Sequence, residues 1–170
     1  MKKSRTYEKY PYWIILISSF VSIATYLLGA LIIRRFGFSL LVIYLLYILL
    51  LEARLLKEGC VDCYYYGKQC AFGKGKLSCL FFKKGNPKKF VSRQITWKQI
   101  IPDFMVSVVP IILGVSLLIT DFEIFLLLQV VLLVLFAFVG SAFVRSSLAC
   151  KHCRQREIGC PAEQLFKAKK

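Results

Sequence analysis

The sequence predicts an all-α integral membrane protein whose four transmembrane helices form two parallel tandem hairpin repeats. Three observations predict this fold class. Hydrophobic residues make up 58% of the 170-residue chain, whereas soluble domains are about 45–50% apolar. The chain is also basic, with 24 Lys and Arg against 9 Asp and Glu, so apolar and basic residues must occupy separate segments. Finally, a cysteine motif of identical spacing follows each of two pairs of apolar runs.

Four uncharged apolar runs predict the helices. A helix needs about 20 apolar residues to cross a bilayer, and its backbone polar groups must bond within the segment. The runs are Trp13–Ile33, Phe36–Leu51, Phe104–Thr120 and Ile124–Val144. We extend the second helix through Glu52 and Arg54 to Leu56. The first run is longer than a signal-peptide core, so we interpret it as a permanent span.

Basic residues predict the orientation of the helices. Four lie in the N-terminal tail (Lys2, Lys3, Arg5 and Lys9), ten lie in the connection 57–98, and seven lie in the tail from 145 onward. The turn after the first helix has only Arg34 and Arg35, and the turn after the third has Asp121 and Glu123. The positive-inside rule therefore places both termini and the middle loop in the cytoplasm of a cell-membrane protein.

Smaller features complete the predicted elements. We interpret Tyr10, Tyr12, Trp13 and Trp97 as interfacial anchors. A short interfacial helix is expected over 91–101, with Pro102 and Asp103 in the first turn of the third span. Gly73–Lys76 predicts a flexible basic turn. The face shared by Ser18, Ser22 and Gly29 predicts close helix packing, and Gln129 predicts a helix–helix hydrogen bond.

The cysteines indicate a duplicated unit. Cys60, Cys63 and Cys70 are spaced C-x2-C-x6-C, and so are Cys150, Cys153 and Cys160, each displaced by 90 residues. Each triad follows a two-helix hairpin. We therefore divide the chain into a cytoplasmic basic tail (1–10), repeat 1 (11–79), a basic interfacial linker (80–101) and repeat 2 (102–170).

The repeats are expected to be parallel, because both hairpins begin and end in the cytoplasm. A pseudo-two-fold axis along the membrane normal would then relate them. That axis would bring the two cysteine triads together. It would also bring the outer turns together, so that Arg34 and Arg35 face Asp121 and Glu123.

The six triad cysteines predict a metal site, with zinc as the first choice. Cytoplasmic thiols stay reduced, which argues against disulfides. Two thiolates spaced C-x2-C hold one soft metal ion, and a third ligand closes around it. Three ligands do not complete a tetrahedral site, so we expect the triads to share ligands across the axis. Lys68, Lys151, Arg154 and Arg156 would favour the thiolate form.

The triad spacing is similar to that of the fungal binuclear zinc cluster domains, and CKHCRQREIGC resembles their basic character. The resemblance covers the two eleven-residue triads and implies two zinc ions bridged by shared cysteines, without DNA binding. The alternative is an iron–sulfur cluster in each triad, with His152, Cys79 or an exogenous group as fourth ligand; Cys160–Pro161 resembles ferredoxin motifs. For Cys79 and His152 we favour a role outside the site.

These observations favour a non-catalytic docking or sensing scaffold with a cytoplasmic metal site. The alternative is a membrane redox protein that transfers electrons through an iron–sulfur centre, and a thiol-based metal-ion carrier ranks third. We expect no enzyme, because one His and nine acids give little material for acid–base catalysis. Lys83, Lys84, Lys88 and Lys89 predict contact with anionic lipid headgroups in preference to nucleic acid. A cytoplasmic or membrane protein partner is also expected.

Overall fold

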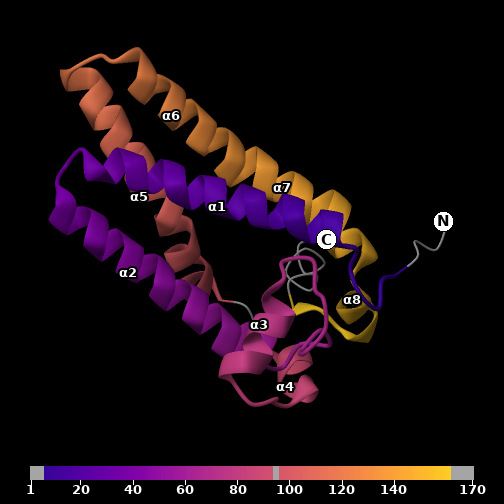
Figure 1. The fold of residues 1–170 in the computed structure, drawn as a ribbon. Helices are drawn as coiled ribbons and strands as arrows, with labels where there is room; N and C mark the ends of the chain where they lie inside the picture. Colours follow the sequence, from indigo (N-terminus) through magenta and orange to yellow (C-terminus); the bar gives the residue numbers. More distant parts are fainter. Residues whose placement is uncertain (1–5, 94–95, 162–170) are drawn as a thin grey trace. The chain divides into compact units, whose positions relative to one another are not determined.

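The computed structural model describes residues 6–93 and 96–161, and those residues form helices joined by turns (Figure 1). The four longest helices are α1 (Tyr12–Arg34), α2 (Phe38–Leu55), α5 (Trp97–Thr120) and α6 (Ile124–Val134). The shorter segments are η1 (Leu56–Cys60), α3 (Lys74–Phe81), α4 (Pro87–Ser92), η2 (Leu135–Gly140), α7 (Ser141–Phe143), η3 (Val144–Ala149), η4 (Cys150–His152) and α8 (Arg154–Ile158). Lys2, Lys3, Arg5, the Trp97 side chain and residues 162–170 lie outside the described part.

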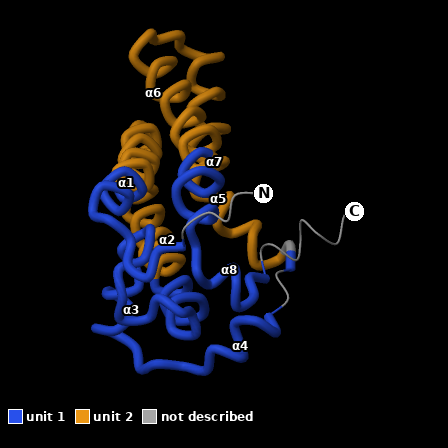
Figure 2. The backbone as a smooth tube through the Cα atoms, turned by 90° about the vertical axis from the view of Figure 1, so that its right-hand side faces the viewer, with its two compact units in different colours: residues 1–19, 53–97, 143–170 blue, residues 20–52, 98–142 orange. Residues whose placement is uncertain are grey.

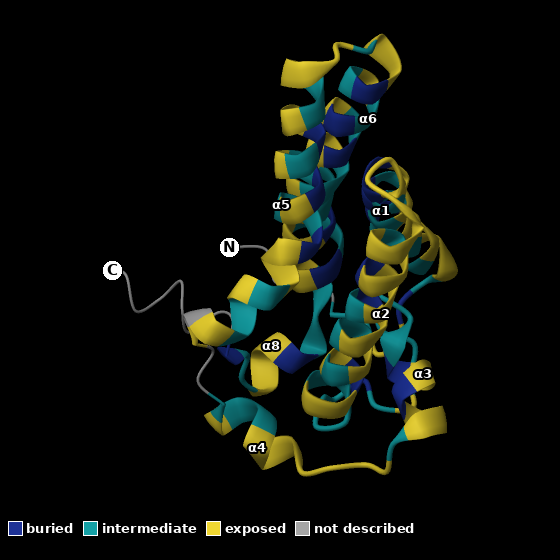
Figure 3. Cartoon of the chain, turned by 90° about the vertical axis from the view of Figure 1, so that its left-hand side faces the viewer, coloured by how far each residue is buried: buried dark blue, intermediate teal, exposed yellow. Residues whose placement is uncertain are grey.

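Four helices are long and apolar enough to span a membrane, as the sequence predicts. They cover Tyr12–Arg34, Phe38–Cys60, Lys98–Thr120 and Ile124–His152. Large hydrophobic side chains are exposed along α1, α2, α5 and α6 (Figure 3). Such faces suit contact with lipid, which requires no polar covering.

The expected interfacial helix over 91–101 is wrong. Helix α4 ends at Ser92, and α5 begins at Trp97. Arg93 between them is extended, and its guanidinium donates to the Glu58 carbonyl and carboxylate at 2.6 and 2.7 Å. This tertiary contact holds Arg93 outside a helix. Because α5 begins five residues before Pro102, that proline lies beyond the first helical turn.

The chain divides into two compact units (Figure 2). Unit 1 comprises residues 1–19, 53–97 and 143–170, and unit 2 comprises 20–52 and 98–142. Unit 2 contains two buried apolar clusters. One joins Ile32 of α1 to Leu126, Val130 and Leu133 of α6. The other joins Ile33 of α1, Tyr44 and Ile48 of α2, and Val106 of α5.

Two tyrosine hydroxyl groups of α2 donate hydrogen bonds to backbone carbonyls of α5 within unit 2. Tyr44 Oη donates to the Val106 carbonyl at 2.9 Å, and Tyr47 Oη donates to the Pro102 carbonyl at 2.9 Å. Gly29 of α1 lies against Tyr44, where a Cβ atom would clash with the hydroxyl group. The close packing predicted at Gly29 is therefore confirmed, and Tyr44 is the residue it faces.

The two outer turns meet through charge, as predicted. The Arg35 guanidinium pairs with the Glu123 carboxylate, and its second nitrogen donates to Glu123 Oε1 at 3.2 Å. The same bond lowers the pKa of Glu123. An exposed pair of this kind contributes little stability, but it specifies which turns lie together.

Candidate metal centre

Both cysteine triads belong to unit 1, where three of their cysteines pack against a small apolar core. The buried core residues are Tyr10, Ile14, Tyr65, Ala71 and Ala149, and Cys63, Cys70 and Cys153 pack against them. Tyr10 is only 2% exposed, and its hydroxyl donates to the Ala149 carbonyl at 2.5 Å. The expectation that Tyr10 is an interfacial anchor is therefore wrong. The Tyr10 ring is buried in the core beside the second triad, so it is not available to contact lipid headgroups.

The two triads share the same local backbone bonds. The Cys63 N–H donates to the Cys60 carbonyl at 3.3 Å, and the Cys153 N–H donates to the Cys150 carbonyl at 3.4 Å. The next bonds also correspond: Tyr66 N–H donates to Cys63 O at 3.1 Å, and Arg156 N–H donates to Cys153 O at 3.2 Å. A π-helical segment precedes each turn, namely η1 and η3. The two turns therefore share these backbone bonds, although the residues after them differ: Arg154–Ile158 is helix α8, whereas Gly67 has φ +72°.

The triads bind each other through two reciprocal hydrogen bonds. Tyr64 N–H donates to Gln155 Oε1 at 2.7 Å, and Arg154 N–H donates to Tyr65 Oη at 3.0 Å. Positions 64 and 154 differ by the repeat offset, and so do positions 65 and 155. Each segment thus offers a backbone N–H at one position and a side-chain acceptor at the next. This exchange is the pattern of contacts made across a two-fold axis.

Both acceptors, Tyr65 and Gln155, are buried, and each is held in place by a second hydrogen bond. Tyr65 and Gln155 are each 3% exposed. Tyr65 Oη also donates to the Tyr7 carbonyl at 2.6 Å. The other end of the Gln155 amide, Nε2, donates to the Gly159 carbonyl at 3.0 Å, which settles the orientation of the amide.

Backbone N–H groups point at three of the cysteine sulfurs. Gly75 N–H donates to Cys70 Sγ at 3.2 Å. Tyr65 N–H bonds Cys63, and Gln155 and Arg156 N–H groups bond Cys153. Tyr65 and Gln155 again differ by the repeat offset. Hydrogen bonds to sulfur stabilise thiolates, and they commonly surround metal-binding cysteines.

Burial nevertheless raises the pKa of two of the thiols, those of Cys63 and Cys153. It raises the pKa of Cys63 to about 11, against the lowering effect of the Tyr65 N–H, and Cys153, Cys70 and Cys160 raise it further. Burial likewise raises the pKa of Cys153, with smaller additions from Cys150 and Cys160. The strongest lowering effect on each thiol is a backbone N–H, instead of the basic side chains that we expected.

The structure brings five triad cysteines into one neighbourhood. Cys63 interacts with Cys70, Cys153 and Cys160, and Cys153 interacts with Cys150. Within residues 6–93 and 96–161, no three His, Cys, Asp or Glu side chains are arranged around one point as metal ligands. These five cysteines therefore lie near one another in unit 1, whereas the convergence of all six on one metal cluster stays a prediction.

The two remaining candidate ligands, Cys79 and His152, each lie beside an aromatic residue of unit 1. Cys79 is exposed on α3 and lies beside the Tyr66 hydroxyl. The His152 ring packs on Tyr7, with centroids 4.9 Å apart. Lys68 and Arg154, which we expected beside the thiols, stack on the Tyr64 ring at 4.0 and 5.6 Å from its centroid.

The sequence did not indicate Tyr65 and Gln155 as organising residues. Tyr65 and Gln155 occupy the same position in the two triads, but tyrosine and glutamine are too dissimilar for a sequence comparison to match them. Only their common ability to accept a hydrogen bond relates them.

No known protein family, curated protein or solved structure matches this chain. The chain is therefore classified by its fold alone: it is α-helical and has four helices that are long and apolar enough to cross a membrane.

Proposed function

We propose that this chain is a multi-pass membrane protein whose two cysteine triads bind zinc at the cytoplasmic face and form a non-catalytic docking or sensing scaffold. The observation that carries the proposal is the reciprocal bonding of the triads, Tyr64 N–H to Gln155 and Arg154 N–H to Tyr65. These bonds hold the two C-x2-C turns together in unit 1. A metal bound there would tie the first hairpin to the second.

Two contacts support a parallel arrangement of the repeats. Arg35 pairs with Glu123, so the turn of the first hairpin meets the turn of the second. The cysteine segments that follow the hairpins also meet, through Tyr65 and Gln155. If the two hairpins were antiparallel, the turn of each would lie beside the cysteine segment of the other. The charge asymmetry of the sequence then assigns the cysteine segments to the cytoplasm.

The donor set favours a soft divalent metal. Burial is the main cause of the raised pKa of Cys63, and repulsion from the neighbouring cysteines would raise it further if several thiols ionised together. A zinc ion replaces that repulsion with attraction, and the N–H groups of Tyr65, Gln155 and Gly75 already point at three sulfurs. Gathering the thiols around the ion would require their side chains to rotate. Metal binding and the stability of unit 1 are therefore expected to be coupled.

Iron–sulfur binding is the second candidate, because N–H donors to cysteine sulfur also tune iron–sulfur centres. Elemental analysis of the full chain, purified without oxygen, distinguishes the two. We expect bound zinc and a colourless protein. A brown protein that contains iron and sulfide would contradict the zinc scaffold and would favour electron transfer through an iron–sulfur centre.

The site is tested with Cys63→Ser and Cys153→Ser, with Cys79→Ser as the matched control. We expect either triad substitution to release metal and to lower the unfolding temperature, because both triads contribute ligands. Cys79 is outside the triads, so its substitution should retain metal. The proposal fails if the wild-type chain binds no metal, or if Cys79→Ser releases metal as completely as Cys63→Ser.

A further inference from the structure

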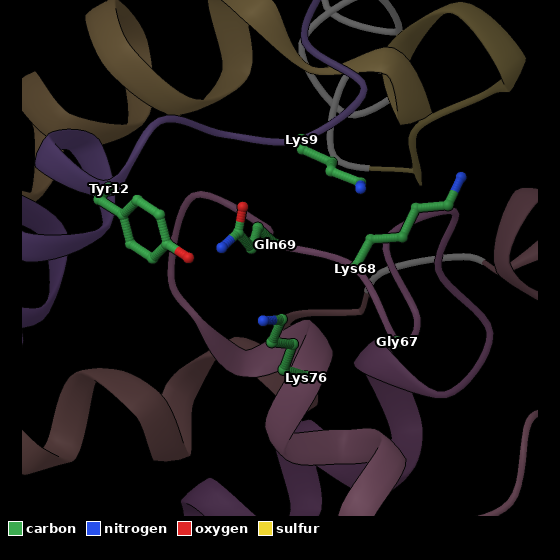
Figure 4. A pocket seen from close by; sticks show the side chains of 6 residues that line it. All are labelled: Lys9, Tyr12, Gly67, Lys68, Gln69 and Lys76. Carbon is green, nitrogen blue, oxygen red and sulfur yellow. The ribbon is translucent and has the colours of Figure 1, made fainter.

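A second site in unit 1 carries positive charge and contains no cysteine. It is a cavity of about 330 Å³ lined by Lys9, Tyr12, Gly67, Lys68, Gln69 and Lys76. Figure 4 shows that the lining residues come from three segments: the residues before and at the start of α1, the 67–69 loop, and α3. None of the described residues that line it is acidic. We propose that this cavity binds a phosphate group, as carried by the headgroup of an anionic phospholipid.

Backbone hydrogen bonds hold the three walls of the cavity together. Tyr10 N–H donates to the Gln69 carbonyl at 3.0 Å and joins the first segment to the loop. Gly67 N–H donates to the Gly75 carbonyl at 2.9 Å and joins the loop to α3. The cavity is therefore formed without a ligand, which reduces the entropy lost on binding.

Two glycines make this arrangement possible. Gly67 has φ +72°, a conformation that side chains disfavour. Gly75 packs so closely on the loop that a Cβ atom would clash with the Tyr65 carbonyl. The expectation of a flexible basic turn over Gly73–Lys76 is accordingly wrong, because Lys74–Phe81 is helix α3. Lys76 is therefore carried on a packed helix at the edge of the cavity.

Two ammonium groups of the cavity are available for a ligand. Among the described residues, no carboxylate pairs with Lys9 or Lys76. The neighbouring acid, Glu8, pairs with Arg154. Lys68 differs, because its ammonium lies over the Tyr64 ring and points away from Lys76 (Figure 4). Lys9 and Lys76 are therefore the cations that a phosphate would bind.

The other lining groups match a phosphate as well. The Gln69 amide and the Tyr12 hydroxyl are hydrogen-bond donors, and phosphate oxygens accept such bonds. A second cavity in unit 1 differs in chemistry. It is lined by Glu58, Asp62, Lys89, Ser92 and Arg93, and its Arg93 already pairs with Glu58. Charge balance thus favours an anion only in the lysine cavity.

The position of Tyr12 favours a lipid as the source of the phosphate. Tyr12 is the first residue of α1, a helix long and apolar enough to span a membrane. The end of such a helix lies at headgroup depth. This choice of source rests on the proposed membrane insertion, whereas phosphate binding itself does not, and neither depends on the metal centre.

The test measures binding of dioctanoyl phosphatidate and of inorganic phosphate to the full chain in neutral detergent by calorimetry. We expect phosphatidate to bind, and Lys9→Gln/Lys76→Gln to weaken binding roughly 30-fold, from about fivefold for each lysine near an anionic group. Lys57→Gln/Lys98→Gln removes two exposed lysines outside the cavity and should change affinity less than twofold. Lys9→Arg/Lys76→Arg keeps the charge and should retain binding, which excludes misfolding as the cause of the loss.

The result also identifies the source of the phosphate. Tighter binding of phosphatidate than of inorganic phosphate supports a lipid headgroup, and equal binding supports a free phosphate. The proposal is overturned if neither probe binds, or if the Lys57/Lys98 pair proves as important as the Lys9/Lys76 pair. Loss of metal in the cysteine variants with unchanged phosphatidate affinity would show that the two sites are independent.

Discussion

Tyr65 and Gln155 show how two unlike side chains serve equivalent positions. Each accepts a backbone N–H from the opposite triad, and each is held by a second hydrogen bond, to Tyr7 and Gly159 respectively. The N–H groups of both residues also bond a cysteine sulfur of their own triad. One residue in each cysteine segment therefore contacts both the opposite segment and a cysteine of its own triad.

We predict that Gln155→Leu destabilises the protein by about 1–3 kcal/mol. Leucine fills similar space but leaves the Tyr64 N–H and the Gly159 carbonyl without partners, and such unsatisfied groups carry that cost. Thermal unfolding of the full chain in detergent measures the loss. Zinc content should fall in parallel if the triads must meet to bind metal.

Gln129→Leu is the matched control at the residue scale. The Gln129 side-chain oxygen is buried and has no hydrogen-bond partner among the described residues, so the helix–helix bond expected for it is not formed by that atom. Removing an unsatisfied acceptor should leave stability unchanged or raise it. Equal losses for the two leucine variants would contradict the role assigned to Gln155.

Sequence patterns anticipated the cysteines and missed the residues that join them. The spacing C-x2-C-x6-C is local, so the equivalent turns at Cys63 and Cys153 followed from it. The partnership of Tyr65 with Arg154 links positions 89 residues apart and is set by the packing of the two segments. The ion pair of Arg35 with Glu123 was predictable, because opposite charges occupied both outer turns.

At the scale of elements, packing decides where helices begin and approach. The predicted 91–101 helix failed because Arg93 is drawn to Glu58. Gly73–Lys76 was misinterpreted because two glycines favour a turn in isolation, whereas Gly75 here permits close contact with Tyr65. The long spans escaped such errors, since their apolar length alone demands a helix in lipid.

Gly29→Ala tests the contact between α1 and α2. The added methyl group would clash with the Tyr44 hydroxyl and lie 3.0 Å from Tyr44 Cζ and 3.2 Å from Pro110 Cγ. Tyr44 cannot withdraw freely, since it bonds the Val106 carbonyl of α5. We expect a loss of about 1–3 kcal/mol in unfolding free energy, as for other overpacked cores.

Gly59→Ala provides the control for this prediction, because its nearest neighbour, Leu55 Cδ1, is 3.9 Å from the added atom. Stability there should stay the same or increase. Combining Gly29→Ala with Tyr44→Phe should recover part of the loss, since the clashing hydroxyl is removed. Equal tolerance of alanine at positions 29 and 59 would show that helix contact does not depend on the glycine.

For the whole molecule, we predict that Ser39 and Lys84 lie on opposite sides of the membrane. Ser39 is in the first turn of α2, close to the Arg35–Glu123 pair, and Lys84 is exposed in the connection between α3 and α4. Ser39→Cys and Lys84→Cys are each labelled in sealed inverted vesicles with an impermeant maleimide, and the labelling of the native cysteines is subtracted. Only the Lys84 position should gain label. A gain at position 39 would reverse the proposed orientation.

The bonds that complete unit 1 also constrain when it can form during synthesis. Tyr10 bonds the carbonyls of both Gln69 and Ala149, and the loop after Cys63 bonds Gln155. The nascent chain therefore makes its first triad long before the segment that pairs with it exists. Until the ribosome has translated the last apolar helix, Cys63 and its neighbours are open to oxidation or to capture by other metals. If the triads bind a metal as proposed, both can contribute ligands to it only after the segment around Gln155 has been synthesised.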